Sequence, residues 1–323
     1  MTMKKLLFVI GGAGYIGSHM VKYASKAGYS VVTLDNLSTG HKDAVKYGEF
    51  EFCELGDSEK LNTLFKKYSP DAVVHFGAAS IVSESVNNPY KYYLNNVVGT
   101  LNLLEVMVKN QCKKIIFSSS ASVYGNPEYS PIDEIHPKKP INPYGKSKLM
   151  VEQILADFDK AYGLKYLVFR YFNAAGHDLD GELTERHEPE THLLPLIINA
   201  AQGKKKYVEI FGTNYDTHDG SCVRDFIHVA DLCEAHLKGL DLFFKSNEEI
   251  SSDYFNLGSS NGFSVKEVIT SVKKELNIDF KVLSKPRREG DPAVLIASNN
   301  KAMKILNFSP KITKIKDIIK TLI

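Results

Sequence analysis

The chain has 323 residues, of which 43% are hydrophobic and 24% are charged, and its formal net charge is +2 at pH 7. This length and composition suit one large or two ordinary globular domains with a sizeable core. The nearly balanced charge gives no reason to expect a nucleic acid or an anionic membrane as partner, and no apolar run is long enough to span a bilayer.

The cysteines are four in number and follow neither a metal-ligand spacing nor a disulfide pattern. We therefore expect no metal site, and a reducing compartment, the cytoplasm. The apolar run Leu6–Ile10 is short and ends in two glycines. It predicts a strand rather than a signal peptide.

Short apolar runs alternate with amphipathic helical patterns through the first half of the chain. The predicted strands are 6–10, 31–34, 72–76, 115–118 and 167–171, and the predicted helices cover about 17–26, 58–68, 89–110 and 143–162. Buried strands that alternate with helices predict an α/β fold, a Rossmann-type doubly wound parallel sheet.

The second half loses this alternation after Asn173. Residues 176–189 have a polar, loop-like pattern, and 223–228 predicts a strand that returns to the sheet. Two further helices are expected at about 264–275 and 299–306. We predict a smaller α/β region interleaved with the first.

The glycine-rich segment 11–17 lies between the first predicted strand and the first predicted helix. Gly11, Gly14 and Gly17 have the G-x-x-G-x-x-G spacing that allows a tight turn, close approach of a pyrophosphate and close helix packing. Asp35 ends the next strand, where it can accept hydrogen bonds from the adenosine ribose hydroxyls. Its charge would repel a 2′-phosphate, so we predict NAD rather than NADP. The alternative is a plain turn and a solvated aspartate.

Other polar or small residues follow the later strands. We expect Asp57 to end the third strand, where it either contacts adenine or caps the next helix. Residues 76–79, Phe-Gly-Ala-Ala, would let a ring pass close to the backbone, and Asn95 and Asn96 need partners if they are buried. Serines 118–120 end a strand at the edge where open α/β sheets bind ligands, although any of them can simply cap the loop.

The segment Asn142–Lys148 predicts a helix with Asn142 as N-cap, running to about Tyr162 and ended by Gly163. Tyr144 and Lys148 are one turn apart on one face. A cation there favours phenolate and would lower the tyrosine pKa from about 10 towards neutrality, which makes Tyr144 a general-base candidate. Alone, this pair is more often a core tyrosine beside a solvated lysine.

Together these motifs resemble the UDP-glucose (UDP-galactose) 4-epimerase family of the extended short-chain dehydrogenase/reductases. The resemblance covers nearly the whole chain through GGAGYIGSH, LDNLSTG, FSSSASVYG, NPYGKSKLMVE, RYFNAAG, GSCVRDFIHVADL, NLGSSNGFSV and PRREGDPA. It implies NAD-dependent epimerisation at C4 of a UDP-hexose through a 4-keto sugar. It also implies an NAD-binding domain at 1–176 plus about 223–257, and a UDP-sugar-binding region at about 177–222 and 258–323.

The resemblance also implies residue roles. Ser120 and Tyr144 would hydrogen-bond the sugar 4-hydroxyl, and Lys148 would hold the nicotinamide ribose. Tyr144 would take the hydroxyl proton while hydride passes from C4 to NAD⁺. The keto sugar would then present its other face, and the hydride and the proton would return, which inverts C4.

The implied sites are larger sets. The cofactor-binding residues would be Gly11, Gly14, Tyr15, Ile16, Gly17, Asp35, Asn36, Asp57, Ser58, Phe76, Ala78, Ser80, Asn95, Ser120, Tyr144, Lys148 and Phe172. The substrate-binding residues would be Ser120, Tyr144, Asn173, His192, Leu193, Glu209, Ile210, Phe211, Arg224, Arg288, Asp291 and Val294. Among these, the two arginines would grip the diphosphate and the aspartate would hold uridine. From charge pattern alone, 287–291 is more often a solvated run.

Three positions depart from the family pattern. Ser80 stands where some members carry a lysine near the cofactor phosphates, so that contact is lost or replaced. His192 stands at a phosphate-contacting position that is asparagine in others. Val294 stands where tyrosine narrows the sugar pocket or a smaller residue admits an N-acetyl group, so we expect UDP-N-acetyl sugars to be accepted too.

Three other functions share part of this pattern. A sugar-nucleotide 4,6-dehydratase needs an acid/base pair after Ser120, where this chain has Ala121 and Ser122. A UDP-glucuronate 4-epimerase or decarboxylase needs a cation for the sugar carboxylate, which the sequence does not identify. A non-catalytic NAD-sensing regulator would be free to lose Tyr144 or Lys148.

The resemblance further implies a homodimer. The helices at about 89–110 and 143–162 would pair with their equivalents on a second chain as a four-helix bundle.

Overall fold

The computed structural model describes residues 4–245, 251–288 and 291–323. They divide into two compact units: unit 1 is Met1–Val123, Pro140–Arg170 and Cys233–Phe255, and unit 2 is Tyr124–Lys139, Tyr171–Leu232 and Asn256–Ile323. The predicted domain ranges differ from these, since the return to unit 1 begins at Cys233 rather than near 223, and residues 124–139 belong to unit 2. No helix of the described ranges combines the length and apolar character needed to cross a membrane.

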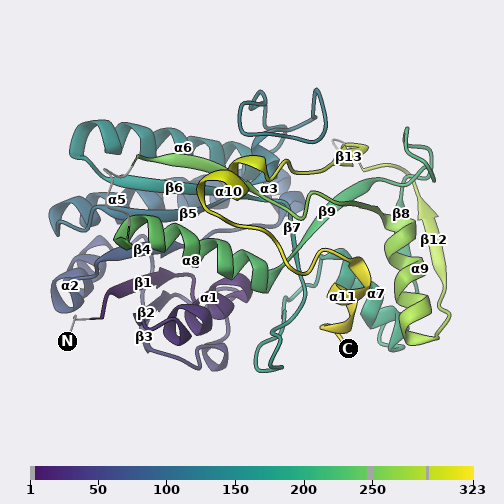
Figure 1. Cartoon of the computed structure of the whole chain (residues 1–323), viewed down its shortest axis with the longest axis horizontal. Helices are drawn as coiled ribbons and strands as arrows, with labels where there is room; N and C mark the ends of the chain where they lie inside the picture. The colour runs from purple at the N-terminus through teal and green to yellow at the C-terminus, as the bar shows by residue number, and fades with distance from the viewer. Residues whose placement is uncertain (1–3, 246–250, 289–290) are drawn as a thin grey trace. The chain divides into compact units, whose positions relative to one another are not determined.

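The strands and helices follow the order of Figure 1. The strands are β1 (Leu6–Ile10), β2 (Ser30–Asp35), β3 (Glu49–Phe52), β4 (Ala72–His75), β5 (Lys114–Ser120), β6 (Lys165–Tyr171), β7 (Asn173–Ala175), β8 (Val208–Phe211), β9 (Val223–His228), β10 (Asp253–Leu257), β11 (Gly262–Ser264), β12 (Val282–Lys285) and β13 (Val294–Leu295). The helices are α1 (Tyr15–Lys26), α2 (Ser58–Tyr68), α3 (Val82–Asn87), α4 (Pro89–Tyr92), the π-helix η2 (Tyr93–Val98), α5 (Gly99–Lys109), α6 (Pro143–Tyr162), α7 (Leu193–Ala201), α8 (Val229–Lys245), α9 (Val265–Leu276), α10 (Asn300–Ile305) and α11 (Ile315–Lys320), with short 3-10 turns η1 (Lys42–Ala44) and η3 (Ala121–Val123).

The main sheet has seven strands in the order β10-β6-β5-β4-β1-β2-β3. Strand β1 pairs in parallel with β2 and β4, β2 with β3, and β4 with β5. The strand order reverses direction between β1 and β4, which is the switch point where such sheets bind ligands. The predicted Rossmann-type sheet is confirmed.

Alternate side chains of the strands bury opposite faces of this sheet. Phe8 and Ile10 of β1 belong to one buried cluster with side chains of α2, α5 and α6, such as Phe65, Leu104 and Leu155. On the other face α8 packs so closely that a Cβ on Gly239 would lie 2.9 Å from the ring of Phe169 in β6. Helices therefore cover both faces, as a doubly wound sheet requires.

Helix α6 has the bounds that the sequence predicts. The Asn142 side chain accepts a hydrogen bond from the Gly145 N–H at 2.8 Å, Pro143 occupies the first turn, and Gly163 ends the helix with φ of 67°. These signals are local, so the sequence was enough to place them.

Two predictions for other segments were wrong. The strand β9 does not return to the main sheet, because it pairs with β7, β11 and β13 in a separate sheet, and β10 is the strand beside β6. An apolar run does not encode which sheet it joins. Asp57 does not end a strand, since β3 stops at Phe52; its carboxylate caps α2 by accepting from the Lys60 N–H at 2.9 Å.

Unit 2 has its own core. It gathers side chains of α7, α9 and α11 with strands β8 and β9, for example Ile197, Ile210, Phe226, Val268 and Ile318. A parallel pair, β8 and β12, completes the unit beside the four-stranded sheet.

Candidate active site

The glycine-rich loop between β1 and α1 depends on close backbone packing. A Cβ on Gly17 would lie 2.1 Å from the Gly11 carbonyl oxygen, and Gly11 itself has φ of +74°. The Gly11 N–H donates to the Leu34 carbonyl at 2.8 Å, which fixes the loop to β2. Packing within the protein therefore requires both glycines.

Gly14 differs, because the protein itself does not require glycine there. Its φ of −78° and ψ of 178° suit any residue, and an added Cβ would meet nothing closer than the Gly11 carbonyl oxygen at 3.4 Å. Gly14 is the N-cap of α1 and provides no side-chain cap. A bare helix N-terminus without a Cβ in front of it fits the pyrophosphate of a dinucleotide.

Asp35 lies at the end of β2 beside this loop and is 8% exposed. Its Oδ2 accepts from the Ala13 N–H at 2.9 Å and its Oδ1 from the Leu37 N–H at 2.8 Å. Each carboxylate oxygen keeps a further lone pair for a ribose hydroxyl. The acid therefore fits NAD and disfavours an added phosphate.

The other predicted cofactor residues of unit 1 lie mostly around the same edge. Tyr15 and Ile16 open α1, Asn36 follows β2, Phe76, Ala78 and Ser80 follow β4, Ser58 opens α2 and Asn95 lies in η2. Ser80 is exposed. Their contacts with a cofactor stay predictions.

Asn96 is the residue that ties these segments together, and it is 2% exposed. Its amide accepts from the Ala79 N–H at 2.8 Å and donates to the Ala79 carbonyl at 3.0 Å. It also donates to Ser147 Oγ at 3.0 Å, and Ser147 donates to the Tyr144 carbonyl at 2.7 Å. The loop after β4 is thereby fixed to the first turn of α6. The sequence showed only that this amide needed partners.

Ser120 and Tyr144 are brought together, as predicted, through a hydrogen bond between their side chains. Burial nevertheless raises the pKa of Tyr144, and the bond with Ser120 offsets part of that rise. The predicted lowering of the Tyr144 pKa by Lys148 is therefore wrong for the protein without ligands. The sequence did not reveal that the phenol hydroxyl is desolvated.

Lys148 lies 2% exposed beneath Tyr144. Its Nζ donates to the Ser118 carbonyl at 2.7 Å and lies 5.9 Å from the centre of the Tyr144 ring. Burial lowers the pKa of Lys148 to about 7, with Glu152 acting in the opposite direction. Nearby, burial and Lys148 lower the pKa of His75 to about 3, so this imidazole is neutral.

Glu152, one turn after Lys148 in α6, forms a buried ion pair with Arg170 of β6. Arg170 donates to Glu152 through Nε at 3.0 Å and Nη2 at 2.7 Å, and Ser119 Oγ donates to the same carboxylate at 2.6 Å. The two charged side chains are 1% and 2% exposed. The hydrogen bonds described for this carboxylate come from Ser119 of β5 and Arg170 of β6, so they fix α6 on the sheet. Sequence reasoning missed it.

The predicted substrate residues of unit 2 form two pairs. Arg224 in β9 donates to the Asp291 carboxylate, although 67 positions separate them. The Arg288 guanidinium lies 3.8 Å above the centre of the Phe211 ring. Two planar cations are thus held in place, which is the form in which arginine binds phosphate. Tyr215, which the sequence did not single out, has a buried hydroxyl without a hydrogen-bond partner among the described residues.

The remaining predicted residues of unit 2 are more dispersed. Asn173 donates to the Asp225 carbonyl at 2.9 Å, and Phe172 is 9% exposed at the end of β6. Glu209 and Ile210 lie in β8, where the glutamate pairs with Lys285 at 3.3 Å, and Val294 of β13 lies beside Val223. His192 and Leu193 begin α7, but the imidazole turns towards Glu185.

Comparison with known proteins identifies the family. The model of the NAD dependent epimerase/dehydratase family matches residues 7–258. The chain belongs to this family. The prediction of NAD as the cofactor is confirmed with it.

Individual relatives are similar over nearly their full lengths. The UDP-glucose 4-epimerase of Halalkalibacterium halodurans is 45% identical over 97% of this chain and 93% of its own. The crystal structure of UDP-glucose 4-epimerase from Brucella ovis in complex with NAD superposes with a TM-score of 0.95 at 43% identity, covering 98% of this chain and 97% of that one. The UDP-Glc/GlcNAc 4-epimerase of Campylobacter jejuni gives a TM-score of 0.85 at 43% identity and covers 98% of both chains.

The difference between Gly14 and the other glycines makes a testable prediction. Gly14→Ala should leave the unfolding free energy of the NAD-free protein within about 0.5 kcal/mol of wild type, because the added Cβ has room. It should weaken NAD binding at least about tenfold, or about 1.4 kcal/mol. Urea unfolding and NAD titration measure the two quantities.

Gly56→Ala is the matched control, since an added Cβ there meets nothing within 4 Å. It should change neither quantity. Unaltered NAD affinity in Gly14→Ala would contradict the assignment of this loop to the pyrophosphate.

Proposed function

We infer that this protein is a UDP-hexose 4-epimerase that interconverts UDP-galactose and UDP-glucose with bound NAD. The observation that carries this function is the hydrogen-bonded pair Ser120 and Tyr144 with the buried Lys148 at the ligand-binding edge of a Rossmann-type sheet. Further support comes from relatives that are similar over nearly the whole chain and whose names state this activity.

Tyr144 is the group that moves the proton. Its oxygen would accept the proton of the sugar 4-hydroxyl, with Ser120 hydrogen-bonding the same hydroxyl. We expect the Lys148 ammonium to oppose the effect of burial on the Tyr144 pKa only when cofactor and substrate are bound, and so to favour the phenolate that this step requires. When bound, NAD supplies the acceptor and donor of the C4 hydride. After the keto sugar has turned, its opposite face would receive the hydride at C4, and Tyr144 would return the proton to the C4 oxygen.

The residues of unit 2 would hold the nucleotide. Arg224 and Arg288 would bind the diphosphate, Asp291 the uridine ribose, and Glu209, Ile210 and Phe211 would line uracil. The pairing of one arginine with a carboxylate and the stacking of the other on a ring support this, because both guanidinium planes are oriented in advance. A firm hold on the nucleotide allows the sugar to turn without leaving.

A competing function, that of a sugar-nucleotide 4,6-dehydratase, needs an acid/base pair just after Ser120. Positions 121 and 122 form the turn η3, where Ala121 is buried and the Ser122 N–H donates to Ser120 Oγ at 3.1 Å. Neither side chain can serve as the acid/base pair of a 4,6-dehydratase. UDP-glucuronate conversion is the second candidate, to be tried if UDP-galactose fails. A non-catalytic NAD sensor would show binding without turnover.

Tyr144→Phe tests the proposed proton transfer. Removing the hydroxyl should lower kcat for UDP-galactose by about 10²- to 10⁴-fold, because general acid–base groups contribute that much. Retained NAD binding should show that the fold is intact. A coupled assay of UDP-glucose formation measures the rate.

Tyr162→Phe is the control on the same helix, since this tyrosine is 50% exposed. It should keep wild-type turnover. An active Tyr144→Phe would mean that another group carries the proton.

The sugar specificity follows from Val294. Because valine is smaller than tyrosine, we propose that Val294 leaves room for an N-acetyl group and that UDP-N-acetylglucosamine and UDP-N-acetylgalactosamine are also substrates. The similarity to the Campylobacter jejuni UDP-Glc/GlcNAc enzyme supports this.

Val294→Tyr should remove activity on UDP-N-acetylgalactosamine while activity on UDP-galactose stays within a few-fold of wild type. Separate assays of the two substrates measure this. The proposal fails if wild-type turnover of the N-acetylated sugar is below about a thousandth of that for UDP-galactose, a gap of about 4 kcal/mol in barrier.

We also propose a homodimer, formed through a stripe of exposed apolar side chains on α3, α4, η2 and α5. Val86, Tyr90, Leu94, Val98 and Leu101 recur at helical spacing and are 42% to 73% exposed. An apolar stripe of this kind marks an interaction surface. The cytoplasm stays our proposed location, because all four cysteines are free thiols.

Leu94→Glu should convert the dimer to a monomer, since a charge in an apolar interface is left without a partner. Light scattering coupled to size-exclusion chromatography measures the mass. Ile135→Glu, at another exposed apolar side chain, should stay dimeric. A wild-type monomer at micromolar concentration would rule out the dimer.

A further inference from the structure

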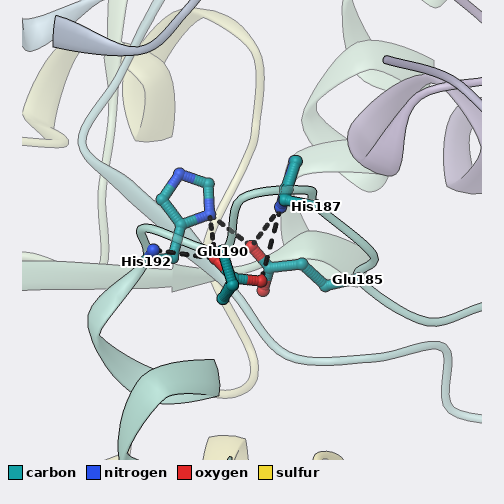
Figure 2. A group of neighbouring side chains, drawn as sticks. All are labelled: Glu185, His187, Glu190 and His192. Carbon is teal, nitrogen blue, oxygen red and sulfur yellow. Dashed lines mark hydrogen bonds and ion pairs between the residues drawn. The ribbon is translucent and has the colours of Figure 1, made fainter. Parts of the chain in front are cut away.

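Four side chains from one short segment of unit 2 converge ahead of α7. Glu185, His187, Glu190 and His192 lie within eight consecutive positions. Each offers one ligand atom, and these atoms all lie within 4.8 Å of one another. Figure 2 shows both imidazoles and both carboxylates turned towards a common centre.

The spacing of these atoms matches a small coordination sphere. His187 Nδ1 lies 3.3 Å from Glu185 Oε1 and 3.7 Å from Glu190 Oε2, and His192 Nδ1 lies 4.0 Å from Glu190 Oε1. His192 Nδ1 also contacts Glu185 Oε1. Four ligands on a tetrahedral zinc ion, at bonds of about 2.1 Å, lie about 3.4 Å apart. Small side-chain rotations would reach that arrangement.

Glu185 supplies an independent reason to expect a cation. Its side chain is 1% exposed, and its Oε2 is buried without a hydrogen-bond partner among the described residues. Both imidazoles instead approach the other oxygen, Oε1. A buried carboxylate oxygen without a partner is costly, and a bound cation would remove that cost.

The segment also orients its outer ligands. Glu190 Oε1 accepts from the N–H groups of Thr191 at 2.7 Å and His192 at 2.8 Å. Its Oε2 is left facing His187. The His192 side chain is 52% exposed, which gives an ion a path from solvent.

We propose that Glu185, His187, Glu190 and His192 bind one divalent transition-metal ion of the zinc type. Two imidazoles with two carboxylates suit zinc, whereas magnesium and calcium prefer an all-oxygen site. Four protein ligands close the coordination sphere, which is the pattern of a structural rather than a catalytic site.

The bound ion would stabilise the N-terminus of α7. His192 is the N-cap of that helix, and its own side chain provides no cap hydrogen bond there. Coordination would fix the preceding segment to this helix end. The site contains none of the groups that move the proton, but His192 is also a predicted substrate contact, so metal binding has to be measured by itself rather than through activity.

A proton-linked cluster is the competing explanation. The two carboxylates raise the pKa of His187 to about 9, so a protonated imidazole also balances the charge. A metal and a proton compete for the same nitrogen. Metal binding must therefore be measured directly.

The test uses the full-length NAD-bound protein without a polyhistidine tag. After removal of metal with a chelator and dialysis, zinc is titrated against a chromophoric chelator, and bound zinc is counted by mass spectrometry. Wild type should bind one zinc per chain. His192→Ala, at the half-exposed ligand, and Glu185→Gln, at the buried one, should each weaken that binding at least about a hundredfold.

His218→Ala is the matched control. His218 also lies near two carboxylates, 3.8 Å from Asp219 and 3.4 Å from Glu267, but these residues lie outside the four-ligand group. This variant should bind zinc as wild type does. Added zinc should raise the melting temperature of wild type and of this control, and should leave His192→Ala unchanged.

The proposal is overturned if wild type holds less than about a tenth of a zinc per chain at micromolar free zinc. It is equally overturned if His192→Ala and Glu185→Gln, shown by circular dichroism to be folded, bind zinc as tightly as wild type.

Discussion

The burial of the Lys148 ammonium at the carboxyl edge of the main sheet is the constraint on which unit 1 depends. A lysine that is 2% exposed is costly to hold in its charged form, and burial brings its pKa to about 7. The chain offsets that cost with the Ser118 carbonyl at 2.7 Å and with Glu152 one turn along α6. Glu152 is in turn held by Arg170. A plain core would use an apolar residue at this position, so the arrangement indicates a function for the cation.

The same edge has to position Tyr144, and it does so through polar bonds to the backbone. Asn96 joins the loop after β4 to Ser147, which binds the Tyr144 carbonyl. These groups lie at the ends of β4 and β5 and at the start of α6, where parallel strands present their carboxyl ends to ligands. The glycine loop and Asp35 lie on the neighbouring strands of the same sheet. An edge fixed by these bonds suits a reaction in which the keto sugar, rather than the protein, has to rotate between the two hydride transfers.

The sequence predicted those features whose causes are local. Asn142, Pro143 and Gly163 determine the ends of α6 by capping, and Gly11 and Gly17 determine the loop by their lack of a side chain. It could not show which sheet receives β9, because the partners of that strand are distant in the chain. It also missed the desolvation of the Tyr144 hydroxyl, the Glu152–Arg170 pair and the convergence of Glu185 with His192. Each of these depends on packing that only the folded chain determines.

The most direct test of the account follows the hydrogen at C4 of the sugar. We would incubate the purified protein with UDP-galactose in deuterated water and follow the sugar signals by proton NMR. The account predicts UDP-glucose that keeps its original hydrogen at C4, because a hydride held on the cofactor does not exchange with solvent, unlike the hydroxyl proton that Tyr144 handles. Deuterium at C4, or no interconversion with NAD bound, would contradict it.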